Sequence, residues 1–157
     1  MAKTQPTRPD ELEPPCALAI VASEYNREYV DGLLSHFSTE LEAIAPGSTL
    51  IVHRVPGAFE VPLAVQELAL RGGVDAVVAF GVIIAGATAH ADLIAQAITQ
   101  GLMQIALQQR TPVIHEVLLV RDEAQARARC LGDEINRGAE AARAAVSMAR
   151  AMRGIHG

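Results

Sequence analysis

The sequence predicts an α/β fold in which one parallel, four-stranded sheet lies between two layers of helices. The first observation is that short apolar runs alternate with segments whose apolar residues recur at helical spacing. The second is that half of the 157 residues are hydrophobic while only 3% are aromatic. The core must therefore consist of Ala, Val, Leu and Ile, which suits helices packed tightly on a parallel sheet. The length is that of one domain.

Four apolar runs are the predicted strands. Those at 17–22 and 75–84 have no polar face, as expected of strands that are buried on both sides. The complete set of expected strands is 17–22, 49–54, 75–84 and 113–120. Because short connections favour parallel neighbours with helical crossovers, these strands are expected in one sheet.

The segments between the strands are the predicted helices. In the first of them, Tyr29, Val30, Leu33, Phe37 and Leu41 recur at close to 3.6-residue spacing. The helices are expected at 27–45, 60–70, 91–109 and 122–152, with ends marked by proline or glycine at 46–47, 72–73 and 111–112. The last helix is expected to bend near Gly132 and Gly138.

Residues 1–15 are polar and carry four prolines. They are expected to form a flexible N-terminal arm outside the core, followed by a single domain at 16–157. There is no internal repeat and no sign of a second domain.

The composition excludes several classes of protein. A net charge of -5, with Lys3 as the only lysine and no basic cluster, argues against nucleic-acid binding. The apolar runs fall short of the ~18 residues that a membrane span needs, so a cytoplasmic protein without membrane contact is expected. Cys16 and Cys130 form no CxxC pair, which favours buried thiols over a disulfide or a zinc site.

The segment from 77 to 92 is the most informative stretch. Its apolar strand ends in the small residues Gly86, Ala87 and Thr88, and His90 then begins a helical pattern. Strand, small-residue turn and helix can direct free N–H groups at an anion. The spacing from Gly81 to Gly86 fits neither GxGxxG nor a P-loop. Such turns are also common without a ligand, so both interpretations stay open.

His90 is a candidate for proton transfer, because an unperturbed imidazole titrates near pH ~6.5. The alternative is a solvated or capping histidine at the start of a helix. Glu60 follows a Pro-Gly turn and is a candidate hydrogen-bond acceptor or a simple helix N-terminal charge. Tyr25 and Phe59 lie in loops after the first two strands, where they are either stacking platforms or core anchors.

Arginines crowd the C-terminal region. Most are expected on a solvated face, and one is a candidate for binding a phosphate, although the pattern does not say which. The arginines concerned are Arg121, Arg127, Arg129, Arg137 and Arg143.

Together these motifs resemble the lumazine synthase family. The matching segments are Tyr25-Asn26, VPGAFEVP at 55–62, GVIIAGATAH at 81–90, Arg129 and NRGAEAA at 136–142. They follow the order and spacing of the family from about residue 16 to 153.

The resemblance implies a flavodoxin-like fold and a reaction without cofactor or metal. This is the condensation of 5-amino-6-(D-ribitylamino)uracil with 3,4-dihydroxy-2-butanone 4-phosphate. The implied catalytic residues are His90, Arg129 and Glu140, with Glu140 supporting the histidine. The implied substrate-binding residues are Tyr25, Asn26, Ala58, Phe59, Glu60, Ile83, Ile84, Gly86, Ala87, Thr88, His115 and Arg129.

The resemblance also implies active sites between subunits, in homopentamers that remain free or form decamers or sixty-subunit shells. The segment 131–135 departs from the usual shell-forming loop, which favours a free pentamer. His115-Glu116 stands where the family usually has Phe-Gly, at the end of the fourth strand, and Arg137 stands for the usual Lys. Ala85 and Ala128 also depart from the pattern.

The sequence leaves two alternative functions open. One is a non-catalytic paralogue that binds flavin or lumazine or forms a shell, and it is motivated by Ala85, His115 and Glu116. The other is a sugar-phosphate or nucleotide binder. Formation of the lumazine by the purified protein distinguishes the enzyme from both.

Overall fold

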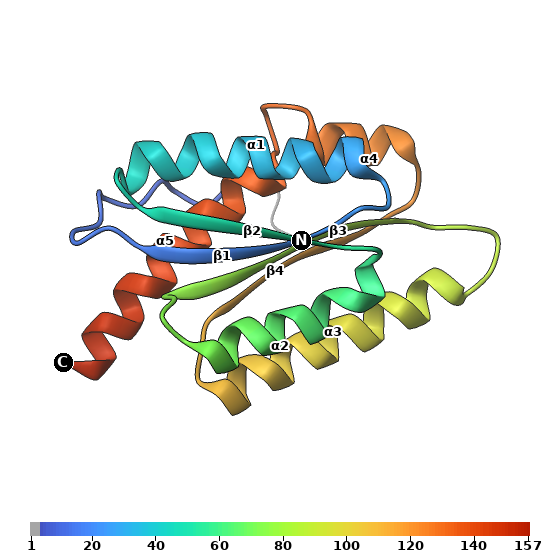
Figure 1. Cartoon of the computed structure of the whole chain (residues 1–157). Helices are drawn as coiled ribbons and strands as arrows, with labels where there is room; N and C mark the ends of the chain where they lie inside the picture. The colour runs from blue at the N-terminus through green and yellow to red at the C-terminus, as the bar shows by residue number, and fades with distance from the viewer. Residues whose placement is uncertain (1–3) are drawn as a thin grey trace.

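The computed structural model describes residues 4–157 and has the predicted α/β architecture (Figure 1). The strands are β1 (Ala17–Ser23), β2 (Thr49–Val55), β3 (Ala76–Ile84) and β4 (Val113–Val120). The helices are α1 (Arg27–Ile44), the 3₁₀ turn η1 (Ala58–Glu60), α2 (Val61–Arg71), α3 (His90–Gln109), α4 (Glu123–Cys130) and α5 (Arg137–His156).

All strand pairs are parallel, and the strand order is β2-β1-β3-β4. The chain therefore runs outward in one direction from β1 to β2 and in the other from β3 to β4. Ligands of open α/β sheets gather outside the carboxyl ends of the strands at such a reversal point. In this sheet the reversal point lies between β1 and β3, where the loops after residues 23 and 84 begin.

Two separate hydrophobic clusters cover the two faces of the sheet. On one face α1, α4 and α5 pack on Ile20, Val78 and Phe80, and Phe37 meets Phe80 edge to face at 5.6 Å. On the other face α2 and α3 pack on Val21 and Val77. The three-layer α/β/α prediction is confirmed, and aliphatic side chains make up most of both clusters as the composition required.

The predicted strands agree with the observed ones to within a residue at each end, whereas two helix predictions need correction. The helix expected from residue 60 begins at Val61 and is preceded by the turn η1. The single helix expected at 122–152 is two helices, α4 and α5. Asn136 explains the break, because its side-chain oxygen accepts hydrogen bonds from Gly138 N and Ala139 N and so starts a new helix.

The N-terminal segment contributes to the core, contrary to expectation. Leu12 is buried in the cluster beneath α1, and its N–H donates to the carbonyl of Ile44. Arg150 of α5 donates to the carbonyl of Asp10. Residues 1–3 of the predicted arm lie outside the described residues. From residue 4 onward, no helix is both long and apolar enough to cross a membrane.

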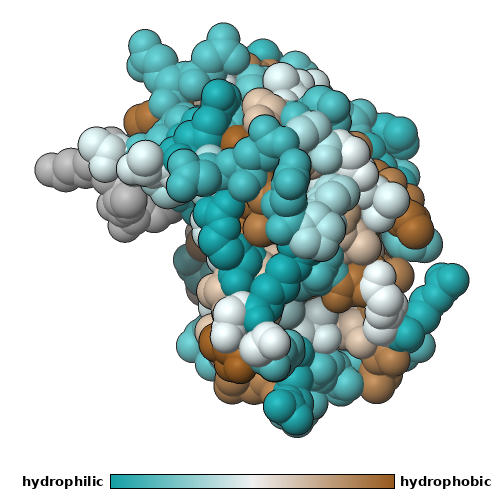
Figure 2. All heavy atoms as spheres, turned by 90° about the vertical axis from the view of Figure 1, so that its left-hand side faces the viewer, coloured by the Kyte–Doolittle hydropathy of each residue, from teal (hydrophilic) through white to brown (hydrophobic). Residues whose placement is uncertain are grey.

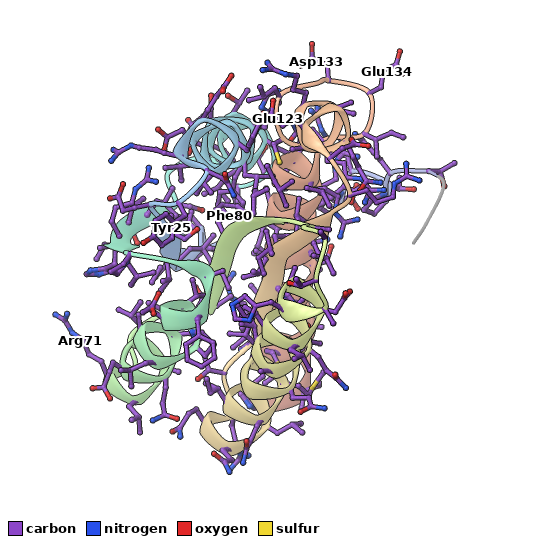
Figure 3. The ribbon with its side chains drawn as sticks, turned by 90° about the vertical axis from the view of Figure 1, so that its right-hand side faces the viewer. Tyr25, Arg71, Phe80, Glu123, Asp133 and Glu134 are labelled. Carbon is purple, nitrogen blue, oxygen red and sulfur yellow. The ribbon has the colours of Figure 1, made fainter. Side chains whose placement is uncertain are left out.

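The end of the sheet at which the strands begin carries mostly hydrophilic side chains, with separate hydrophobic patches (Figure 2). Most candidate functional residues lie at the opposite end. Figure 3 views that end, with Tyr25 beside α1 and with Asp133 and Glu134 projecting from the loop between α4 and α5.

Candidate functional site

Asn26 joins the loop after β1 to the neighbouring strand β3. Its side-chain amide donates to the carbonyl of Val82 at 2.7 Å, across the reversal point of the sheet. Its backbone has φ 56°, a left-handed conformation that few residues other than glycine adopt. Asn is among the residues that tolerate it, and such backbone outliers cluster at functional sites.

The loops after β1 and β2 are hydrogen-bonded to each other. Glu24 N donates to the carbonyl of Val55 at 2.8 Å, and Tyr25 N donates to that of Pro56 at 3.1 Å. A side chain on Gly57 would meet the Tyr25 ring at 2.9 Å, so the ring lies directly over this glycine. Tyr25 and Phe59 are nevertheless 72% and 64% exposed. They are therefore available for stacking and are not core anchors.

The Glu60 carboxylate accepts a hydrogen bond from Gly57 N at 2.9 Å. This contact closes η1 and holds the loop of 56–60 in one shape, so one of the two carboxylate oxygens has a local structural role at the start of the helical segment. The side chain remains exposed. Ala58 is half-buried between this loop and β3, where Ile83 and Ile84 are also half-buried.

The turn between β3 and α3 is open to solvent. Gly86, Ala87 and Thr88 are exposed, and His90 is the first residue of the 20-residue helix α3. The His90 N–H points to Thr88 Oγ1 at 3.5 Å. A side chain on Gly86 would meet nothing within 4 Å, so the space beside this glycine is open. The exposed first turn of α3 offers N–H groups to an anion.

His115 lies away from the turn between β3 and α3. It is the third residue of β4 and pairs with Ala79, so the expectation that it ends the fourth strand is wrong. At about 3.3 Å per residue, Ala79 lies roughly 16 Å from Ile84, the last residue of β3. Within one chain His115 is therefore remote from the turn that precedes His90.

The His115 ring is held in one tautomer. Val117 N donates to Nδ1 at 3.2 Å, so Nδ1 is the acceptor and the proton resides on Nε2. Nε2 lies 2.7 Å from the hydroxyl of Thr99 on α3. Burial, and then the charge of Arg137, lower the pKa of His115, which keeps the ring neutral. No sequence signal pointed to Thr99, because its partner is on another element.

Glu116 faces the opposite side of the sheet from His115, as alternation along a strand requires. Its carboxylate is 7% exposed and binds the Arg137 guanidinium through both oxygens, with Oε2 at 3.1 Å from Nε and Oε1 at 3.2 Å from Nη2. Nη1 of Arg137 lies 2.7 Å from Oε2 of Glu140, which is also almost buried. Burial raises the pKa of Glu116 to about 7, against the attraction of Arg137. We call Glu116, Arg137 and Glu140 the Arg137 cluster.

Arg129 is in the last turn of α4 and is partly buried. The loop that follows is fixed by Asn136, whose side-chain amide donates to the carbonyls of Cys130 and Gly132. Asn136 thus sets the position of α4 relative to Arg137 at the start of α5. The arginines expected on a solvated face differ: Arg127 is exposed, whereas Arg137 and Arg143 are largely buried in ion pairs.

The predicted site residues lie in two parts of the fold, and within one chain His115 is separated from the carboxyl ends of the strands. The carboxyl-end group surrounds the reversal point of the sheet and consists of Tyr25, Asn26, Ala58, Phe59, Glu60, Ile83, Ile84, Gly86, Ala87, Thr88 and His90. The second group lies on β4, α4 and α5 and consists of His115, Arg129 and Glu140, joined by Glu116 and Arg137. The strand β4, which carries His115 and Glu116, is an edge of the sheet.

Metal chemistry has no evident ligand set in the described part of the chain. Within residues 4–157, no three His, Cys, Asp or Glu side chains gather in a way that could hold a metal ion. Cys16 and Cys130 are buried free thiols, as expected.

Comparison with known proteins gives one consistent result. The family model described as 6,7-dimethyl-8-ribityllumazine synthase matches residues 15–153. A protein of that name from Kineococcus radiotolerans is 46% identical over 141 residues, which cover 88% of this chain and 86% of that protein. One from Leifsonia xyli is 43% identical, with 89% and 88% covered, and 6,7-dimethyl-8-ribityllumazine synthase 1 from Caulobacter vibrioides is 41% identical, with 90% and 93% covered.

Proposed function

Since the chain belongs to the 6,7-dimethyl-8-ribityllumazine synthase family, we propose that its two groups of site residues are two halves of one active site, which neighbouring copies of the chain complete. The reaction is the condensation of 5-amino-6-(D-ribitylamino)uracil with 3,4-dihydroxy-2-butanone 4-phosphate. It yields 6,7-dimethyl-8-ribityllumazine, phosphate and water, and it belongs to riboflavin biosynthesis. The enzyme is a transferase.

The carboxyl-end group binds the flat pyrimidine and the phosphate. Tyr25 offers an exposed ring for stacking, while Ala58, Phe59 and Glu60 meet the ring and the ribityl chain with Ile83 and Ile84. The turn of Gly86, Ala87 and Thr88 holds the phosphate at the start of α3, where N–H groups and the helix dipole favour negative charge.

His90 moves the protons. The amine of the pyrimidine attacks the ketone carbonyl, and loss of water gives an imine. Elimination then releases the phosphate and leaves an enol, which tautomerises to a second carbonyl. The ribitylamino nitrogen attacks this carbonyl, and loss of a second water closes the ring. Each step transfers a proton to or from nitrogen, carbon or oxygen, which an imidazole can do near neutral pH. The exposed place of His90, next to the turn proposed for the phosphate, supports this role.

The second group approaches from a neighbouring copy. Arg129 of that copy stabilises the leaving phosphate as a guanidinium does well, with paired N–H donors. Glu140 supports His90, and His115 meets the pyrimidine as a neutral ring. The observation that carries this proposal is the separation of His115 from the carboxyl-end group by several residues along the sheet, because one chain alone then holds an incomplete site.

Assembly into a homopentamer is part of the proposal, since the resemblance implies that unit. Exposed apolar side chains on α3 support an interface between copies, because soluble monomers seldom expose many on one helix. They are Leu93, Met103 and Leu107, at 64%, 62% and 71% exposure. Native mass spectrometry distinguishes a free pentamer from a decamer or a sixty-subunit shell, and a monomer that retains full turnover would contradict the shared site.

The direct test is to mix the purified protein with both substrates and to follow the absorbance and fluorescence of the lumazine. No product at high protein concentration contradicts the proposed function and leaves a non-catalytic role. His90→Ala is expected to lower kcat on the order of 10²-fold, as loss of a general acid and base does. His156→Ala, at the end of α5, is the control and should keep the wild-type rate.

Arg129→Ala is expected to act mainly on the phosphate substrate, raising its KM about tenfold, as loss of a charge-assisted hydrogen bond does. Arg127→Ala is the matched control, because Arg127 lies on the same helix and its side chain is turned to Tyr29 and Glu28. Equal KM values in the two variants would refute the role of Arg129.

We also propose a cytoplasmic location, because a phosphorylated substrate crosses membranes poorly.

A further inference from the structure

The Arg137 cluster has an unusual charge balance for a nearly buried site. Two carboxylates, Glu116 and Glu140, share one guanidinium, and their side chains are 7% and 9% exposed. Burying a charge is costly unless it is paired and hydrogen-bonded, so a second carboxylate on one arginine is not a favourable way to stabilise a fold. The fold could place an apolar residue at position 116 of a buried strand, as it does at Val117 and Leu118.

We propose that Glu116 is a positioning residue of the active site: it clamps Arg137 from one side, opposite Glu140, and so fixes the guanidinium and the Glu140 carboxylate for the substrates. This inference rests on the proposed function, in which the second group completes the site of a neighbouring copy. Glu116 itself need not touch a substrate, because it acts through Arg137.

The geometry of the guanidinium supports the clamp. Glu116 takes Nε and Nη2 in a two-point contact, which fixes the plane of the group and not only its position. Glu140 takes Nη1 at 2.7 Å. These three contacts leave further N–H groups of Arg137 beyond the two glutamates. The Arg137 side chain is 20% exposed, so part of it reaches the surface.

The clamp depends on the protonation of Glu116. The titratable groups around it are Arg137 and Glu140 on α5, Cys130 on α4, and His115, the preceding residue of β4, which feels the charge of Arg137. Burial raises the pKa of Cys130 to about 12 and lowers that of His115, so both are neutral near pH 7. Arg137 is therefore the one cation among these groups, and Glu116 and Glu140 compete for it.

A protonated Glu116 loses one of its two acceptor positions, because the oxygen that carries the proton becomes a donor. The two-point contact with Nε and Nη2 then opens, and Arg137 is held by Glu140 alone. The pKa of about 7 places this change within the working range of the enzyme. The clamp is closed above that pH and open below it.

The test is Glu116→Gln in the full-length enzyme, with kcat measured from about pH 5.5 to about pH 8.5, around the pKa of Glu116. Glutamine has the same size but offers Arg137 only one acceptor at every pH. We expect kcat to fall about tenfold at the alkaline end, as loss of one charge-assisted hydrogen bond does. At the acid end the variant and the wild type should agree, since the clamp is open in both.

The matched control is Glu40→Gln. It removes a nearly buried carboxylate from a different ion-pair cluster, in which Glu40 pairs with Arg8 and Arg143. It should lower stability and leave the pH profile of kcat unchanged. If Glu116→Gln lowers kcat by the same factor at every pH, or not at all, the positioning role is refuted and Glu116 is only structural.

A second measurement does not need turnover. Binding of 6,7-dimethyl-8-ribityllumazine, followed by its fluorescence, should weaken several-fold in Glu116→Gln at about pH 8.5 and remain unchanged at about pH 5.5. If the wild type and Glu116→Gln bind the lumazine with equal affinity at each of the two pH values, the clamp is refuted. If the wild type binds the lumazine but forms none, the proposed function fails, and these affinities still decide whether Glu116 positions Arg137.

Discussion

Two ion-pair clusters of this protein, each built on a nearly buried carboxylate, have opposite charge balance. In the first, Glu40 of α1 lies between Arg143 of α5 and Arg8 of the N-terminal segment, at 3.0 and 2.8 Å. This Glu40 cluster has one carboxylate for two guanidiniums. In the Arg137 cluster, two carboxylates share one guanidinium. Both clusters link α5 to a neighbouring element.

The difference appears in the pKa values of the carboxyl groups. The hydrogen bond from Arg8 is the main cause of a lowered pKa for Glu40, and Arg143 adds to it. Burial raises the pKa of Glu116 to about 7, because one shared arginine does not compensate for desolvation. Glu40, with two arginines, stays ionised near neutral pH, whereas burial of Glu116, with a small addition from the charge of Glu140, makes a group that titrates near neutrality, which is typical of functional sites.

The largest expected effect comes from disturbing the packing of α5 on α1, because α5 carries residues of both clusters. A side chain on Gly138, at the start of α5, would lie 2.1 Å from the carbonyl oxygen of Leu33 on α1. Gly138→Ala must push α5 away from α1, and we expect the free energy of unfolding to fall by about 3 kcal/mol or more in urea denaturation. Gly154→Ala is the control, because nothing lies within 4 Å there. It should be neutral or slightly stabilising.

The second prediction compares the loss of stability when each cluster loses an arginine. Arg137→Met leaves Glu116 and Glu140 without their shared cation, and we expect a loss of about 3 kcal/mol in urea denaturation at neutral pH. Arg143→Met leaves Glu40 paired with Arg8, so its loss should be about 1 kcal/mol. Similar losses in the two variants would show that the charge balance of a cluster does not matter for its stability.

The third effect is a pH dependence of opposite sign in the two clusters. The pKa of Glu116 is raised in the folded state, so its stabilising contribution is complete below its unfolded pKa and is lost as the pH rises to about 7. The stability of the wild type relative to Glu116→Gln should therefore fall with rising pH, on the order of 3 kcal/mol.

For Glu40 the pKa is lowered, so its contribution is present above its unfolded pKa and is lost as the pH falls through its folded pKa. The stability of the wild type relative to Glu40→Gln should fall on acidification. Urea titrations of both pairs of proteins at several pH values measure the two slopes. Slopes of the same sign would contradict the contrast between the clusters.

The smallest effect concerns the neutral neighbour of the Arg137 cluster. Thr99→Val removes the hydrogen-bond partner of His115 Nε2, and we expect a loss of about 1 kcal/mol in the free energy of unfolding. The loss should not depend on pH near neutrality, because the pKa of His115 is lowered. Thr39→Val, on the surface of α1, is a control for the change of side chain.

The strands were predictable because burial on both faces leaves a local pattern, as at β1 and β3, which have few polar residues. The break between α4 and α5 was not predictable, because it depends on hydrogen bonds from Asn136 to Cys130 and Gly132. The spacing of hydrophobic residues in the sequence does not reveal these bonds. Leu12 in a proline-rich polar segment gave no sign of its burial beneath α1.

For the site, the motifs identified the residues and the family, since short segments such as 55–62 and 81–90 carry their spacing in the sequence. Their assignment to substrates stays a prediction. Glu116 and Arg137 were visible only as departures from the pattern, and the sequence did not pair them.

The sequence by itself therefore determined the α/β class, the strands and the loop residues at their carboxyl ends, because these follow from hydrophobic periodicity and local turn chemistry. Only the tertiary structure decided which partners Glu116 and His115 have on the two sides of β4, and that His115 lies several residues along the sheet from the carboxyl ends of the strands. The physical reason is that ion pairs and site geometry join residues that are far apart in the chain, whose distances depend on how the helices pack on the sheet.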